Sequence, residues 1–200
     1  TIATPPKRRI DLISESIKAL SVRAILLEKP VTDNFTDLKN LTNLSNKNRQ
    51  ISFAVNYFRN FEPEYQKISN EIKNGLLGFP LKVIVNYSKG FLNNGSHFSV
   101  FISKFMGNVL SAKIIKKNHF FNEEDYEPDF FVKYNNGEAY FISYDEKNFS
   151  NYDITIFGKN GKVHIPISGK EIFYWEVVND KKFKNYRILT PHPKIMRSDI

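Results

Sequence analysis

Two short segments of this chain carry side chains that could move protons, Glu28-Lys29-Pro30 and His97. The stretch 24–31 is an apolar run that ends abruptly in Glu28-Lys29-Pro30, which is typical of a buried parallel strand that feeds a loop. Ligands bind at the carboxyl ends of strands in open α/β sheets, so we expect the Lys29 amine to meet a substrate there. A partly desolvated lysine can exchange a proton with a substrate hydroxyl at neutral pH. A salt bridge from Lys29 to Glu28 or a neighbour is the structural alternative.

His97 follows Asn93-Asn94-Gly95-Ser96, at the expected start of a helix that Gly107 ends. A helix N-terminus lowers the pKa of a histidine, which keeps the ring neutral and able to accept a proton. The alternative is a polar capping loop with an incidental histidine.

The other histidines give weaker signals. His119 lies near three carboxylates, Glu123, Glu124 and Asp125, but their spacing matches no recognised metal site, and we expect no metal. His164 in an expected hairpin strand and His192 between two prolines are expected to be structural. The chain has no recognisable Ser-His-Asp or P-loop signature.

The composition limits the classes of protein. The 200 residues are 41% hydrophobic and include no cysteine, which excludes disulfides, thiolate metal sites and a cysteine nucleophile. No apolar run approaches membrane-spanning length and the first residues lack the plan of a signal peptide, so we expect a cytoplasmic protein with no membrane partner.

The net charge of +8 favours anionic ligands. The basic residues are scattered and no binding motif accompanies them, so we expect no nucleic-acid partner; binding through the charge alone would fall steeply with added salt.

Residues 1–60 alternate short strands with amphipathic helices. Thr1–Thr4 is expected to be the end of a strand that Pro5-Pro6 stops, and further strands are expected at 24–28 and Ile51–Val55. The helix between the first two has apolar residues at Ile10, Ile13, Ile17 and Leu20. The helix after strand 24–28 is expected to have Asp33 as its N-cap and a core stripe of Phe35, Leu38, Leu41 and Leu44. This order predicts parallel βαβ units.

After Asn56 the pattern becomes largely β. A helix begins at Pro63 and ends at Gly75, and another spans about Phe98 to Met106. Asn135-Asn136-Gly137 and 158–161 are turns of two predicted hairpins. The hairpin strands are Phe130–Tyr134 with Glu138–Tyr144, and Ile154–Phe157 with Lys162–Ile167, and they join strands Leu81–Tyr87 and Leu110–Lys116. We expect one large, mostly antiparallel sheet with flanking helices, its aromatic residues filling the core.

The first glycine of the chain is Gly75. A dinucleotide phosphate must approach bare backbone at a helix N-terminus, so residues 1–74 cannot form a glycine-rich cradle. We therefore expect the chain to be a fragment that lacks the first part of a cofactor domain, and to be inactive alone.

Taken in order, five segments resemble the Gfo/Idh/MocA family of NAD(P)-dependent sugar oxidoreductases. They are Ala3-Thr4-Pro5-Pro6, Leu27-Glu28-Lys29-Pro30-Val31, Val55-Asn56-Tyr57-Phe58-Arg59-Asn60-Phe61, Asn94-Gly95-Ser96-His97 and Ile156-Phe157-Gly158-Lys159-Asn160-Gly161. The resemblance implies an α/β (α+β) fold. Residues 1–57 would be the C-terminal part of a dinucleotide-binding Rossmann domain, and residues 58–200 a substrate-binding and dimerisation domain.

The resemblance also implies the site. Cofactor-binding residues would be Thr4 and Pro5 with Glu28-Lys29-Pro30, and the cofactor would be NAD or NADP. Lys29 and His97 would be catalytic, one of them handling the hydroxyl proton while hydride passes between a sugar carbon and the nicotinamide. Lys29 would also touch the substrate, a sugar, nucleotide sugar or polyol, together with Arg59 and the segment Asn93, Asn94 and His97. The chain would form a homo-oligomer through the open sheet face.

Two positions depart from the family pattern. Many members have aspartate four residues before the histidine and three residues after it, where this chain has Asn93 and Val100. A proton relay through such carboxylates is therefore not expected. The alternative function is a non-catalytic dimerising or sugar-binding module derived from the same family.

Overall fold

The structure is a computed structural model that describes residues 1–19, 21–118, 120–123, 125–166 and 169–198. The chain forms two compact units, Thr1–Phe58 and Arg59–Ile200, which we call the N-terminal unit and the C-terminal unit. None of the described helices is long and apolar enough to cross a membrane.

The N-terminal unit has the expected order of helices and parallel strands. Its elements are the 3-10 helix η1 (Pro6–Arg8), α1 (Arg9–Ala19), β1 (Ala24–Leu27), α2 (Phe35–Lys47) and β2 (Ser52–Val55). Strands β1 and β2 pair in parallel, with Leu27 opposite Val55. The strand end expected at Thr1–Thr4 is present only as a single parallel bridge from Ile2 to Leu27, which is shorter than expected. Pro5 and Pro6 follow at once and have no N–H to extend the ladder.

Helix α2 corrects two expectations. Its N-cap is Asn34 and not Asp33, because the Asn34 side chain accepts the Asp37 N–H at 2.8 Å. The expected core stripe is also only half buried: Phe35 is 82% exposed and Leu38 is 42% exposed, whereas Leu41 is buried. The small apolar core consists of Ile13, Ile25, Leu27, Leu41 and Ile51. Two short strands give the first turns of α2 little apolar surface to cover within this unit.

The C-terminal unit is built on a nine-stranded sheet. Its strands are β3 (Leu81–Tyr87), β4 (Val109–Lys116), β7 (Asp129–Tyr134), β8 (Gly137–Ser143), β9 (Tyr152–Phe157), β10 (Gly161–Ile165), β11 (Glu171–Asn179), β12 (Arg187–Leu189) and β13 (Lys194–Arg197). Their order is β12-β11-β10-β9-β3-β8-β7-β4, with β13 also paired to β11. The mostly antiparallel sheet is confirmed, with one exception: β3 and β8 pair in parallel.

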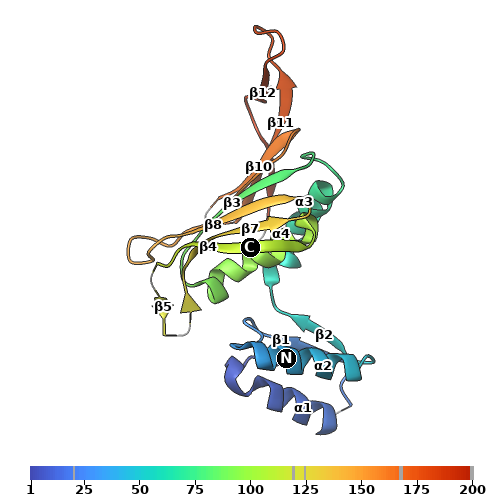
Figure 1. The fold of residues 1–200 in the computed structure, drawn as a ribbon. Coiled ribbons are helices and arrows are strands. Elements are labelled where there is room, and N and C mark those ends of the chain that lie inside the picture. The colour runs from blue at the N-terminus through green and yellow to red at the C-terminus, as the bar shows by residue number, and fades with distance from the viewer. Residues whose placement is uncertain (20, 119, 124, 167–168, 199–200) are drawn as a thin grey trace. The chain divides into compact units, whose positions relative to one another are not determined.

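Two helices, α3 (Pro63–Lys73) and α4 (Ser96–Met106), cover one face of this sheet (Figure 1). Both helices were expected, and Gly107, with φ +76°, ends α4 as the sequence indicates. Ile68 and Ile72 of α3 and Phe101 and Phe105 of α4 are buried against the sheet. The two hairpins β7–β8 and β9–β10 are confirmed.

The other face of the sheet carries no helix in the described part of the chain (Figure 1). Half-buried side chains form a cross-strand row there. In register order the row is Phe131, Tyr140, Ile84, Thr155, His164 and Phe173. We call this the open face.

The sequence did not predict strands β11, β12 and β13, nor the short pair β5 (Phe120–Asn122) and β6 (Asp125–Tyr126). The alternation of buried Ile172 and Tyr174 with half-buried Phe173 and Trp175 is the signal that marks β11.

Candidate functional site

In the N-terminal unit the polar candidates lie at the carboxyl edge of parallel strands. The Ile2 segment, β1 and β2 run in parallel, so Thr4, Glu28 and Asn56 follow them at the same edge. The Asn56 side-chain amide donates to Glu28 Oε1 at 2.6 Å, and the Asn56 N–H donates to the Leu27 carbonyl at 2.7 Å. This edge is where ligands bind in open α/β sheets.

Arg9 holds this edge together, and sequence reasoning did not single it out. It is only 2% exposed, and its Nη1 donates to the carbonyls of Glu28 and Pro30 while its Nη2 donates to the carbonyl of Thr4. Burial lowers the pKa of the Arg9 guanidinium from its ordinary value, while the Glu28 carboxylate acts in the opposite direction. The starting value is so high that the group stays charged. Arg9 lies four residues before the buried Ile13, so the helical period could have placed it on the inner face.

Lys29 is half-buried and follows β1 directly, between two residues whose carbonyls Arg9 binds. The Lys29–Pro30 peptide bond is cis. The segments of Thr4 and of Glu28-Lys29-Pro30, far apart in sequence, therefore meet around one buried guanidinium. Pro5, which follows Thr4, is exposed in an extended conformation before η1.

In the C-terminal unit Asn93, Asn94 and His97 lie on one helical stretch. The chain leaves β3 through Lys89 and Gly90, both with positive φ, and enters a π-helical turn, η3 (Phe91–Gly95), which continues directly into α4. The sequence suggested that the helix begins at His97, whereas the helical stretch begins before it, at Phe91. The first N–H groups belong to residues 90–93, and two carboxylates accept three of them. Asp125 accepts from Leu92 and Asn93, at 2.8 and 2.9 Å, and Glu127 accepts from Gly90 at 2.6 Å.

His97 is 4% exposed and lies beside the ring of Tyr152, with 6.4 Å between ring centroids. Tyr152 stacks on Phe98 at 3.9 Å, and the Arg59 guanidinium lies 4.1 Å from the Tyr152 ring centroid. A guanidinium over an aromatic face is a favourable cation–π arrangement. The structure thus brings Arg59 and His97 to the same tyrosine. The Asn94 side chain is turned inward and donates to the Ser88 carbonyl at 2.9 Å.

Two buried tyrosines, Tyr65 and Tyr152, lie beside Arg59, and their surroundings shift the pKa of each hydroxyl. Burial raises the pKa of Tyr65 to about 12, against the opposing effect of Arg59. The Tyr65 hydroxyl donates to the Gly169 carbonyl at 3.1 Å. Burial likewise raises the pKa of Tyr152, again opposed by Arg59. Both phenols therefore stay protonated at neutral pH and serve as fixed hydrogen-bonding groups.

The remaining histidines are away from this site or not described. His164 on the open face contacts Asp153 through Nε2 at 2.6 Å, consistent with its expected structural role. His119 and Glu124 lie outside the described residues. Among the described residues no group of three or more His, Asp or Glu side chains could hold a metal ion.

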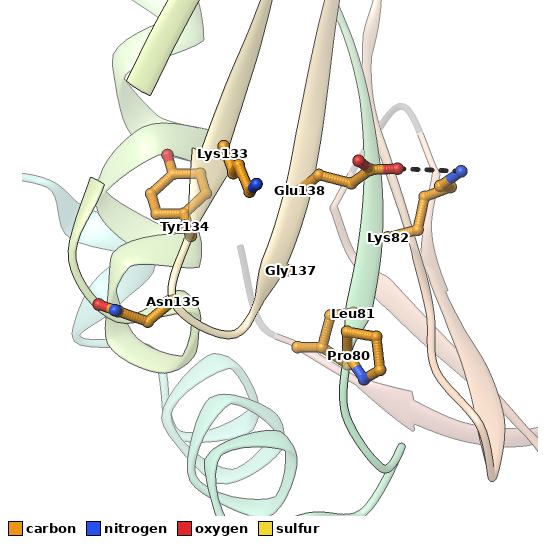
Figure 2. A pocket seen from close by; sticks show the side chains of 8 residues that line it. All are labelled: Pro80, Leu81, Lys82, Lys133, Tyr134, Asn135, Gly137 and Glu138. Atoms are coloured by element: carbon orange, nitrogen blue, oxygen red, sulfur yellow. Dashed lines mark ion pairs between the residues drawn. The ribbon is translucent and has the colours of Figure 1, made fainter. Parts of the chain in front are cut away.

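A separate pocket of about 530 Å³ lies where β3, β8 and β7 are neighbours in the sheet. Figure 2 shows the side chains that line it. The pocket contains none of the candidate site residues. It is lined by Pro80, Leu81, Lys82, Lys133, Tyr134, Asn135, Gly137 and Glu138. Lys82 and Glu138 form an ion pair at 3.0 Å, which raises the pKa of Lys82. An exposed pair of this kind contributes little to stability, and we assign this pocket to the surface of the sheet.

No protein-family model and no curated protein sequence matches the chain. Solved structures match its fold at low sequence identity. A NAD binding oxidoreductase from Klebsiella pneumoniae is 13% identical, with a TM-score of 0.75, over 99% of this chain and 61% of its own. An inositol dehydrogenase homolog from Azotobacter vinelandii, solved with NADH and myo-inositol, is 12% identical, with a TM-score of 0.74, over 97% of this chain and 54% of its own.

The WlbA dehydrogenase from Bordetella pertussis, solved with NADH and UDP-GlcNAcA, is 18% identical, with a TM-score of 0.65, over 81% of this chain and 56% of its own. The chain thus spans little more than half the length of these proteins. At such identity the likeness establishes the fold, which both units share with these oxidoreductases.

Proposed function

We propose that the chain is part of an NAD(P)-dependent oxidoreductase that acts on a sugar, nucleotide sugar or polyol by hydride transfer. One observation carries the proposal: Arg9 gathers Thr4 and the Glu28-Lys29-Pro30 segment at the carboxyl edge of parallel strands. That edge lies in a fold shared with oxidoreductases solved with NADH. The resemblance to the Gfo/Idh/MocA family implies that these residues act together in hydride transfer.

The residues present fit one half of the cofactor. Thr4, Pro5, Glu28, Lys29 and Pro30 would hold the nicotinamide-ribose part, because hydroxyl-bearing sugars need hydrogen-bond partners at a strand edge. The pyrophosphate part has no glycine cradle within residues 1–74, so residues 1–74 do not discriminate NAD from NADP. Bound NAD or NADP would supply the hydride chemistry.

The chain's own residues would handle the proton and the substrate. Lys29 or His97 takes the hydroxyl proton in oxidation and returns it in reduction. His97 suits this task because the Tyr152 ring and near-complete burial fix its orientation. Asn93, Asn94 and Arg59 bind the substrate, and Arg59 favours one with a negative charge or several hydroxyls. Sugar-like ligands in two of the matched structures support this substrate class.

Replacing Lys29 tests the catalytic assignment. In a preparation that oxidises a polyol or sugar with NAD or NADP, Lys29→Ala is expected to lower turnover by roughly 10²- to 10⁴-fold, the usual worth of a positioned acid or base. The fold should stay intact, as judged by circular dichroism. Lys39→Ala, an exposed lysine on α2, is the matched control. Full activity of Lys29→Ala would remove this residue from the mechanism.

We also propose that the open face joins two copies of the chain. Phe131 and Tyr140 lie 5.1 Å apart there, Phe173 and Trp175 lie 6.0 Å apart, and Lys162 lies 5.0 Å from the Trp175 ring. Aromatic rings that stay partly exposed at both ends of the row are side chains of the kind enriched in protein–protein interfaces.

Sedimentation velocity tests this oligomer. Tyr140→Glu is expected to convert an oligomer to monomer, because it replaces a ring of the open face, next to Phe131, by a charge. Phe183→Glu, at an exposed aromatic residue in the β11–β12 turn, is the control and should leave the oligomer unchanged. A wild-type chain that sediments as a monomer at high concentration refutes the proposal.

A further inference from the structure

We propose that Asp125 and Glu127 are positioning residues for the segment that carries Asn93, Asn94 and His97. This inference rests on the function proposed above, because it assigns the residues that fix the same site. Asp125 is 5% exposed and Glu127 is 1% exposed. Buried carboxylates are costly unless hydrogen bonds satisfy them, so their place beside this segment needs a reason.

The reason lies at the start of the helical stretch. The first N–H groups of a helix have no partner within the helix, and the residue just before it usually supplies an oxygen. Here that residue is Gly90, which has no side chain. Asp125 and Glu127, more than 30 residues later in the chain, accept the N–H groups of Gly90, Leu92 and Asn93 instead. Hydrogen bonds from N–H groups to carboxylates are about twice as strong as neutral ones, and a negative charge at a helix start is favourable.

Gly90 is matched to this arrangement. A Cβ atom at Gly90 would lie 1.9 Å from Asp125 Oδ2, and the residue has φ +82°. Any side chain would therefore push the carboxylate away from Leu92 and Asn93. The close approach of the two segments depends on a glycine here.

The backbone that follows the two carboxylates is itself bonded to the core of the C-terminal unit. The Tyr87 hydroxyl donates to the Pro128 carbonyl at 2.6 Å, and the Ser143 hydroxyl donates to the Glu127 carbonyl at 2.9 Å. Tyr87 is fully buried at the end of β3. Strands β3 and β8 therefore fix the segment of Asp125 and Glu127, and this segment fixes the backbone of residues 90–93. His97 follows four residues later, in the first turn of α4.

This arrangement bears on the departure at Asn93. The Asp125 carboxylate accepts the backbone N–H of Asn93 itself. Because Asp125 accepts two backbone N–H groups, it orients the segment. The segment can keep its geometry with asparagine at position 93.

Amide hydrogen exchange and NMR of the ligand-free chain test the proposal. In Asp125→Asn, exchange at the Leu92 and Asn93 amides should become at least about tenfold faster, because each loses a charged acceptor. The His97 ring resonances should shift, while the indole resonance of Trp175, the only tryptophan, should not. Asp180→Asn is the matched control, since Asp180 also accepts two consecutive N–H groups, of Lys182 and Phe183.

Unchanged exchange at Leu92 and Asn93, or unchanged His97 resonances in a folded Asp125→Asn chain, overturns the proposal. A shift of the His97 resonances that is as large in Asp180→Asn as in Asp125→Asn also overturns the proposal. If Asp125→Asn does not fold, two other variants carry the same test. Glu127→Gln should speed exchange at the Gly90 amide, and Gly90→Ala should speed exchange at the Leu92 amide. The turnover of Lys29→Ala, measured as described above, tests the proposed function separately, so a failure of one proposal can be told from a failure of the other.

Discussion

Replacing Arg9 by methionine should destabilise the N-terminal unit and leave the C-terminal unit unchanged. Methionine keeps much of the apolar stem and removes the guanidinium. The carbonyls of Thr4, Glu28 and Pro30 then lose the donor that holds them at one edge.

The magnitude follows from those three contacts. A hydrogen bond to a charged group is worth about 1.5 to 3 kcal/mol, but the three share one donor and are not additive. Burial lowers the pKa of Arg9, so its removal also relieves a desolvation cost. Counting about 1 kcal/mol for each carbonyl gives a loss of about 3 kcal/mol. A unit of this size, Thr1–Phe58, has a total stability of about 3 to 9 kcal/mol.

Amide exchange measures this loss unit by unit. Exchange at the β1 and β2 amides should become about 100-fold faster in Arg9→Met, since about 1.4 kcal/mol corresponds to a factor of ten. Fluorescence of Trp175, which lies in the C-terminal unit, should report an unchanged urea midpoint. Arg8→Met removes an exposed guanidinium one residue away and is the control. Equal exchange rates in the two variants would refute the role given to Arg9.

Two further outcomes are expected. Partial burial acts to raise the pKa of Glu146, but hydrogen bonds from Ser88 and Lys89 outweigh it, so the folded-state pKa is lowered. The stabilisation is therefore present above the unfolded pKa and is lost as the pH falls through the lowered value. Glu146→Gln should lower the free energy of unfolding by on the order of 0.5 kcal/mol at pH 7 and leave it unchanged in strong acid. Urea titration at several pH values measures this difference. Asn34→Ala should destabilise α2 by about 1 kcal/mol in thermal unfolding, whereas Asp33→Ala should not, and equal losses would contradict the N-cap assignment.

The sequence predicted the elements whose signals are local. The helix begun by Pro63, the strand Leu81–Tyr87 and the hairpin with Asn135-Asn136-Gly137 were found because caps, alternation and turn residues act over a few positions. Asp33 failed as an N-cap because a neighbouring asparagine competes equally well, and only the backbone angles decide between them.

The site was less predictable because its supports come from distant segments. Arg9 stabilises the Glu28-Lys29-Pro30 segment across about 20 residues, and Asp125 binds Leu92 and Asn93 across more than 30. No periodicity or spacing in a single sequence marks such contacts. The π-helical turn before His97 was missed for the same reason, since its first N–H groups bind carboxylates that lie far along the chain.

The position of β3 also has a consequence for the order of folding. It lies between β8 and β9, each more than 50 residues later in the chain, while the hairpins β7–β8 and β9–β10 close over short turns. The entropy of closing those long loops is lost before β3 gains either strand partner, although α3 and α4, its neighbours in sequence, pack against it locally, so we expect the hairpins to form first and β3 to pair with them late. Substitutions at Val83 or Val85 should then speed unfolding more than they slow folding, as chevron kinetics would measure. The strand that leads into the His97 segment would be the last part of the sheet to assemble.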